Sequence, residues 1–297
     1  FFSDRGVVYC LNAYQIPIGS RTSRGTPIVQ LLPIPRDEKI TSVIPVAEFT
    51  EDEYLVMLTT GGYIKKTALA AFSNIRTNGL IAISLEEGDQ LRWVRRAREQ
   101  DTILIGSSLG KAIHFRANHE QLRPLGRATR GVRAMNLRQG DGLIGMAILP
   151  SQIVADLAQE LESASDSDEE TVETETTTSL GPWVLVVTTG GFGKRVPVSQ
   201  FRLQNRAGMG IVATKFRKAG DRMAALHIVN EDDELMMITN RGIIIRQSVN
   251  AISSQSRAAS GVRVQRLDED DAIAAVALVP SSGEEAAALG EDVVDEE

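Results

Sequence analysis

The stretch YLVMLTTGGYIKKT, at residues 54–67, holds the pattern that decides the fold. A run of apolar residues leads into Thr-Thr-Gly-Gly, and a second, partly apolar run follows. Apolar runs on both sides of a glycine turn are typical of a β-hairpin, because glycine adopts the positive φ that such turns need. The stretch WVLVVTTGGFGKRV, at residues 183–196, repeats the pattern closely. The two stretches predict a fold built from repeated units.

Three landmarks recur in register along the whole chain. They are the turn glycine, a second glycine that follows an arginine, and an aspartate ten to twelve residues after that. The turn glycines are Gly6, Gly62, Gly110, Gly191 and Gly242, the second glycines are Gly25, Gly79, Gly131, Gly210 and Gly261, and the aspartates are Asp37, Asp89, Asp141, Asp221 and Asp271. Successive second glycines are 54, 52, 79 and 51 residues apart, so the unit is about 51 residues long with one insertion before its fourth copy.

Each unit contains four short apolar runs, which is the strand content of a propeller blade. One four-stranded sheet cannot bury its own faces, so we expect the units to pack against one another. We predict an all-β propeller of about five four-stranded blades, and call the repeats modules 1–5, at about residues 1–54, 55–101, 102–152, 183–233 and 234–282. The run IVQLL at residues 28–32 is one expected strand. We expect the repeated aspartates to bind turn amides and Cys10 to lie in the core.

The charge is distributed unevenly along the chain. The net charge of −7 arises from 32 basic and 39 acidic residues. Residues 153–180 hold nine acidic residues and no Lys or Arg, and residues 283–297 hold seven more and again no Lys or Arg. The rest of the chain therefore carries an excess of about nine basic residues, which predicts a polyanionic partner. We expect a partly disordered acidic insertion and a disordered acidic tail, which either compete with that partner or are merely solvated linkers.

Several other classes of protein find no support in the sequence. No apolar stretch approaches the roughly 18 residues that cross a bilayer, and no signal peptide precedes the repeats. One cysteine and three histidines provide neither a disulfide framework nor a zinc site. No P-loop or nucleophile elbow is present. We expect a cytoplasmic, non-catalytic chain without a metal ion or cofactor of its own.

Basic side chains recur at equivalent places in the modules, either after the hairpin turn or around an Arg-x-x-x-Gly element. In a ring of blades such residues would form a band around the rim, where phosphates of a bent duplex could bind them. No motif suggests specific contacts to DNA base edges, so we expect binding that is independent of the DNA sequence. The alternatives are that each arginine merely caps loops within its own module, or that the band binds an acidic protein. The candidate DNA-binding residues are Arg21, Arg24, Lys65, Lys66, Arg76, Lys111, Arg116, Arg123, Arg127, Arg130, Arg133, Lys194, Arg195, Arg202, Arg206, Arg246, Arg257 and Arg263.

The sequence motifs of these units resemble those of a known family. The stretch YQIPIGSRTSRGTPIVQLLPI at residues 14–34, the two Thr-Thr-Gly-Gly hairpins and the acidic tail are similar to the C-terminal domain of the bacterial DNA gyrase A subunit. The resemblance implies a β-pinwheel, a propeller-like ring whose blades exchange strands and which wraps double-stranded DNA. It also implies a holoenzyme of two A and two B subunits that introduces negative supercoils, with ATP hydrolysis in the B subunit and DNA cleavage elsewhere in the A subunit.

Two departures from that family qualify the expectation. Pinwheels of this family typically have six blades, the first with a basic box of the form QRRGGKG, and no such box occurs here. We therefore expect a truncated six-blade ring. The alternative is the A subunit of the sister enzyme topoisomerase IV, which lacks the box and acts in relaxation and decatenation.

Overall fold

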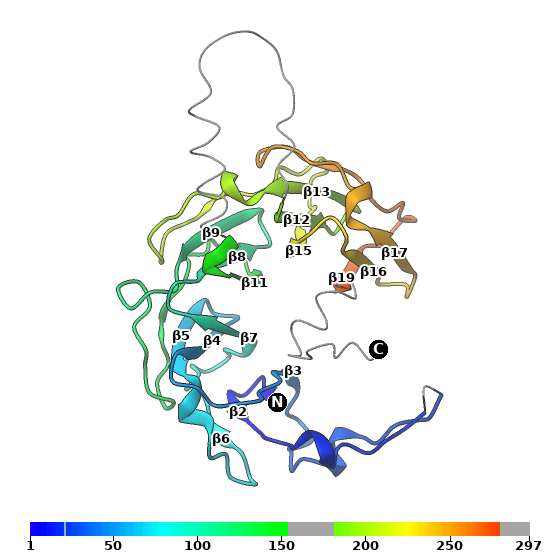
Figure 1. Cartoon of the computed structure of the whole chain (residues 1–297). Coiled ribbons are helices and arrows are strands. Elements are labelled where there is room, and N and C mark those ends of the chain that lie inside the picture. The colour runs from blue at the N-terminus through cyan, green and yellow to red at the C-terminus, as the bar shows by residue number, and fades with distance from the viewer. Residues whose placement is uncertain (21, 154–180, 280–297) are drawn as a thin grey trace, which may run out of the picture.

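The computed structural model describes residues 1–20, 22–153 and 181–279. Its strands form five antiparallel sheets that follow one another around an open arc (Figure 1). This confirms the predicted all-β, propeller-like fold. No helix among these residues is long and apolar enough to cross a membrane.

Four of the sheets have four strands each and the fifth has three. In sheet order the strands are β3 (Ile40–Ser42), β1 (Phe2–Ser3), β2 (Val7–Val8) and β6 (Leu80–Ile81); β10 (Val132–Arg133), β5 (Tyr63–Ala68), β4 (Glu53–Thr59) and β7 (Leu91–Arg98); β11 (Leu143–Leu149), β8 (Thr102–Ser107), β9 (Lys111–Arg116) and β14 (Ile211–Val212); β15 (Met223–Val229), β12 (Trp183–Thr188), β13 (Phe192–Pro197) and β18 (Val262–Arg263); and β17 (Ile244–Ser248), β16 (Glu234–Thr239) and β19 (Ile273–Val279). The connections contain the 3-10 helices η1 (Ala13–Gln15), η2 (Ile28–Gln30), η3 (Leu69–Phe72), η4 (Val198–Gln200) and η5 (Val249–Ala251).

Four of the five repeated aspartates bind hairpin turns, as the sequence predicts; Asp37 instead pairs with the guanidinium of Arg5, which corrects the prediction for module 1. Asp89 Oδ1 accepts hydrogen bonds from the backbone N–H of Gly61 at 2.6 Å and from Thr60 Oγ1 at 2.9 Å. A Cβ at Gly61 would lie 2.8 Å from Asp89 Oδ2, which explains the first glycine of Thr-Thr-Gly-Gly. Asp141 and Asp221 bind the turns of modules 3 and 4 in the same way. In module 5, Asp271 accepts a bond from the N–H of Arg241 at 3.3 Å.

Neighbouring modules exchange one strand, as the family resemblance implies. The short strands β6, β10, β14 and β18 each pair with the outer strand of the preceding module. The second glycine of the repeat makes this close approach possible. Gly131 has a φ of 96°, and a Cβ there would lie 2.4 Å from the carbonyl oxygen of Ile64 on β5. Backbone contact between modules therefore requires glycine at this position.

The two ends of the arc lack this exchange, so the prediction of five complete four-stranded blades is wrong for the fifth. Among the described residues, no strand pairs with the outer edge of β17. The expected strand at residues 28–32 is instead a 3-10 turn, η2, because no outer strand lies beside it to accept its hydrogen bonds. The prediction of a sixth blade stays a prediction.

The hydrophobic cores lie between successive sheets. Alternate residues of a strand face opposite sides, so each central strand contributes to two cores. On β4, Leu55 and Met57 face the core shared with module 1, whereas Val56 and Leu58 face the core shared with module 3. The strands β7, β11, β15 and β19 lie toward the centre of the arc, and β5, β9, β13 and β17 lie toward its outside (Figure 1). The outer strands and their loops are therefore the surfaces available to a long partner.

Candidate nucleic-acid interface

The candidate basic residues divide into three groups by their exposure. Arg21 lies outside the described residues, as do residues 154–180 of the acidic insertion and the whole acidic tail. The exposed group comprises Arg24, Arg76, Arg116, Arg123, Arg130, Arg133, Arg202, Arg246 and Arg263. The half-buried group comprises Lys111, Arg127, Arg206 and Arg257, and the buried group comprises Lys65, Lys66, Lys194 and Arg195.

The structure corrects the prediction that Lys65 and Lys194 lie on the rim, because both side chains are buried. Lys65 Nζ donates hydrogen bonds to the carbonyl oxygens of Gly126, Arg127 and Thr129 in the next module. Burial lowers the pKa of each of these lysines to about 8, so both remain charged at neutral pH and can donate all three protons. These lysines position a loop and do not present a charge to a partner.

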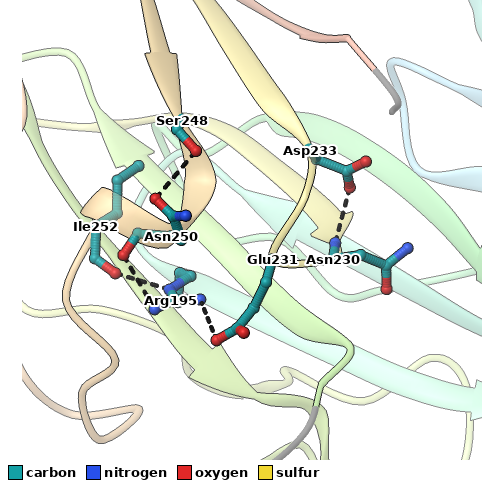
Figure 2. Close-up of polar contacts among 7 residues, drawn as sticks. All are labelled: Arg195, Asn230, Glu231, Asp233, Ser248, Asn250 and Ile252. Atoms are coloured by element: carbon teal, nitrogen blue, oxygen red, sulfur yellow. Dashed lines mark hydrogen bonds and ion pairs between the residues drawn. The ribbon is translucent and has the colours of Figure 1, made fainter. Parts of the chain in front are cut away.

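Lys66 and Arg195, one residue further along each hairpin, are also buried rather than exposed. Lys66 Nζ donates to the carbonyl oxygen of Ala117 in the next module. Arg195 Nε donates to the carbonyl oxygen of Ile252 at 2.7 Å, and its guanidinium lies 3.3 Å from the carboxylate of Glu231 (Figure 2). Burial lowers the pKa of Lys66, like that of its neighbour, to about 8.

The half-buried arginines of the Arg-x-x-x-Gly element reach back to the preceding module. Arg127 donates to the carbonyl oxygen of Ala71 at 2.7 Å, and Arg206 Nε donates to that of Gln121 at 2.6 Å. Arg257 donates to the carbonyl oxygen of Val212 on β14, as Arg206 also does to that of Arg133 on β10. These arginines do bind backbone carbonyl groups, but in the preceding module rather than in their own, which corrects the loop-capping alternative. The contact between modules explains why the arginine recurs at a fixed distance from the glycine.

Several of the exposed arginines are free to bind a partner. Among the described residues, the side chains of Arg24, Arg76, Arg116, Arg123 and Arg202 form no hydrogen bond or ion pair, whereas Arg130 and Arg246 pair with Glu86 and Glu234.

Aromatic rings hold two more of the exposed arginines at equivalent places. Arg133, on the outermost strand β10, lies 4.5 Å from the ring centroid of Tyr63. Arg263, at the same position of β18, lies 5.5 Å from that of Phe192. Stacking on a ring orders an arginine without neutralising its charge.

The sequence interpretation missed neutral residues beside the basic ones. Gln204 lines a surface pocket of about 440 Å³ between modules 3 and 4, together with Arg116 and Arg202. A neutral amide carries no charge pattern, so only its place two residues after the candidate Arg202 could have drawn attention to it. Cys10 is exposed, which corrects its expected place in the core. Within the described ranges, no group of three or more His, Cys, Asp or Glu side chains could hold a metal ion.

Comparison with known proteins identifies a family and its fold. A model of the family described as "DNA gyrase C-terminal domain, beta-propeller" matches residues 1–47, 53–98, 101–150, 182–230 and 233–280. The chain is 67% identical over 288 residues to the DNA gyrase A subunit of Synechocystis sp., with 96% of this chain and 34% of the relative covered. It is 40% identical over 293 residues to the chloroplastic/mitochondrial DNA gyrase A subunit of Arabidopsis thaliana, with 96% and 30% covered. The chain thus spans about a third of the length of these relatives.

Two solved structures share the fold at lower sequence identity. A C-terminal domain of DNA topoisomerase IV matches with a TM-score of 0.78 and 24% identity, covering 97% of this chain and 82% of the other. A DNA gyrase A C-terminal domain matches with a TM-score of 0.70 and 23% identity, covering 93% and 80%. At this identity the likeness concerns the fold alone.

Proposed function

The chain belongs to the family of DNA gyrase C-terminal domains, and from that premise we propose that it binds and wraps duplex DNA without reading its sequence. The observation that carries the proposal is the recurrence of exposed arginines on the outer strands and loops of successive modules. Arg76, Arg123, Arg202 and Arg263 belong to modules 2, 3, 4 and 5. Phosphates offer negative charge continuously along a duplex, so cations spaced along an arc can bind it at several points.

Distributed contacts suit a bent duplex better than one local cluster. Bending 20–30 base pairs by 40–90° costs roughly 1–6 kcal/mol, which many weak phosphate contacts can offset. Seven of the exposed candidate arginines have no carboxylate partner among the described residues: Arg24, Arg76, Arg116, Arg123, Arg133, Arg202 and Arg263. If each neutralises one phosphate, the slope of log K against log salt is about −6.

Within a complete enzyme, we propose that the wrapped DNA is presented to the remainder of the gyrase A subunit, with the B subunit supplying ATP hydrolysis. In this role the chain has no catalytic step and needs no cofactor, and it acts in the cytoplasm. The relatives at 67% and 40% identity are DNA gyrase A subunits, which favours gyrase over topoisomerase IV. The test of this assignment is a topology assay, in which the chain joined to its core should introduce negative supercoils into relaxed plasmid.

Measurement of duplex affinity tests the binding itself. Fluorescence anisotropy with two unrelated duplexes between 50 and 200 mM salt should give equal affinities and a steep salt slope. An affinity that barely changes with salt would contradict phosphate binding and favour the alternative scaffold that meets an acidic protein.

A further inference from the structure

The pocket between modules 3 and 4 is built from two loops that follow outer elements. Arg116 ends β9, and Asn118 and Gln121 lie in the loop after it. Arg202 and Gln204 follow η4 in the next module. The pocket has a volume of about 440 Å³, which lies within the usual range for small-ligand sites of roughly 300–1,000 Å³. It can therefore hold a phosphate together with part of an attached sugar.

The polar atoms of this pocket are mostly hydrogen-bond donors. The amide oxygens are already used: Asn118 Oδ1 accepts from the N–H of Gln121 at 3.0 Å, and Gln121 Oε1 accepts from that of Arg206 at 3.1 Å. Asn205 Oδ1 accepts from Gln121 Nε2 at 3.1 Å. The amide nitrogens of Asn118 and Asn205 therefore remain available as donors.

One donor in the pocket is buried and has no partner. Gln204 Nε2 is inaccessible to solvent and makes no hydrogen bond to any described residue. A buried polar group without a partner is costly, and such an atom commonly marks the place of a ligand or water. The guanidinium groups of Arg116 and Arg202 are exposed and also have no partner among the described residues. Glu120 is the one carboxylate among the lining residues, so the two guanidiniums outnumber it.

The two arginines distinguish this junction from the others. In the strand pairing, the position of Arg116 corresponds to Ala68 in β5, Pro197 in β13 and Ser248 in β17. The position of Arg202, directly after a buried apolar residue, is occupied by Ser73 in module 2, Arg123 in module 3 and Ser253 in module 5. Within the described part of the chain, only the junction of modules 3 and 4 has an arginine at both positions, and both line the pocket.

We propose that this pocket binds one phosphate group through Arg116, Arg202 and Gln204. The phosphate comes either from the backbone of bound DNA or from a free phosphate compound, and both offer the same oxygens to the same donors. The case in which the phosphate belongs to DNA rests on the proposed function. In that case the pocket is a fixed anchoring point on the arc, whereas the other exposed arginines are separate contacts.

The experiment compares two variants of the 297-residue chain with a control matched in charge. Arg116→Ala with Arg202→Ala removes both guanidiniums, and Gln204→Leu removes the buried donor without changing the charge. Arg138→Ala with Lys218→Ala removes two exposed cations that do not line the pocket. The readouts are the duplex affinity at several salt concentrations and the shift of the melting temperature with inorganic phosphate.

For a backbone phosphate, the double arginine variant should lose affinity for duplex roughly 10-fold or more beyond the control, and its salt slope should fall by about 0.9, the contribution of one phosphate. Gln204→Leu should weaken duplex binding with no change in slope, because no charge is lost. For a free phosphate compound, inorganic phosphate should raise the melting temperature of the wild type and the control but not that of the double variant. A double variant that matches the control in both readouts overturns the proposal. A wild type that binds no duplex contradicts the proposed function alone, because the phosphate readout still reports on the pocket.

Discussion

The Nζ of Lys194 donates a hydrogen bond of 2.6 Å to the backbone carbonyl oxygen of Arg257, a residue of the next module. The same ammonium binds the carbonyl oxygens of Ser256 and Ala259 at 2.9 and 2.8 Å. The guanidinium of Arg257 in turn donates to the carbonyl oxygen of Val212. One buried lysine thus orders the whole loop that carries the repeated arginine, and Lys65 does the same for the loop of Arg127.

Replacement of Lys194 by Met should therefore destabilise the fold. The substitution keeps an unbranched side chain one atom shorter than lysine but leaves three inward-facing carbonyl oxygens without their donor. We expect the free energy of unfolding to fall by about 3 kcal/mol, measured by urea denaturation. Lys215→Met, at an exposed position, is the control and should change it by less than about 0.5 kcal/mol. Equal effects of the two substitutions would contradict a positioning role for Lys194.

The same buried lysines should make stability depend on pH above neutrality. Burial lowers the pKa of Lys65 and Lys194 to about 8 in the folded chain, whereas the ordinary value of 10.5 applies after unfolding. Between pH 8 and 10 the unfolded chain therefore holds more protons than the folded chain, so the free energy of unfolding contributed by these groups rises with pH. Above pH 10 the effect is opposed by Tyr9, whose pKa burial raises to about 12.

Urea denaturation at pH 8, 9 and 10 measures this contribution. The wild type should gain stability over this range relative to the variant Lys65→Met with Lys194→Met, which lacks both titrating groups. If the free energy of unfolding changes with pH equally in the two chains, the lysines titrate normally and the prediction is wrong.

The sequence predicted the features that depend on local pattern. The hairpins, their turn glycines and the aspartates that bind the turn amides each follow from residues close together or repeated in register. The burial of Lys65 does not, because the loop that covers it comes from residues 126–129 of the next module. The 3-10 turn η2 could not be predicted for the same reason, since its apolar residues form a strand only when an outer strand lies beside them.

The sequence pattern located the recurring basic residues, but it did not separate those that stabilise the fold from those free to bind a partner. A recurring arginine can recur because the fold needs it, as Arg206 does with the carbonyl oxygens of Gln121 and Arg133, or because a partner needs it. Sequence periodicity is the same in both cases. Only the exposure of Arg123 and Arg202, which bind nothing among the described residues, distinguishes the second group.

The second glycine of the repeat offers a test of strand exchange with an internal control. Gly131 and Gly25 hold the same place in the repeat and have φ values of 96° and 72°. A Cβ at Gly131 would lie 2.4 Å from the carbonyl oxygen of Ile64, whereas nothing lies within 4 Å of a Cβ at Gly25. Gly25→Ala should cost only the backbone strain of about 1 kcal/mol, and Gly131→Ala more than about 3 kcal/mol, in urea denaturation. Equal costs would show that β10 does not lie against β5 in solution.

Substitution of free arginines on the outer loops should weaken DNA binding without affecting the fold. Arg24→Ala, Arg76→Ala and Arg123→Ala together remove one exposed cation from each of modules 1, 2 and 3. If each neutralises one phosphate, the salt slope of duplex affinity falls by about 2.7 on two unrelated duplexes alike. Because the three side chains make no hydrogen bond or ion pair to any described residue, the melting temperature should not change.

The control for this triple variant removes the same charge from an inner strand and from two loops that lead into inner strands. Arg92 lies on β7, and Arg138 and Lys218 precede β11 and β15, the strands toward the centre (Figure 1). Replacement of all three by Ala should leave the salt slope close to that of the wild type, since screened charges away from the duplex release few counterions. If the salt slope of duplex affinity falls as much in this control as in the triple arginine variant, the duplex does not follow the outer strands. The arrangement proposed for wrapping would then be wrong.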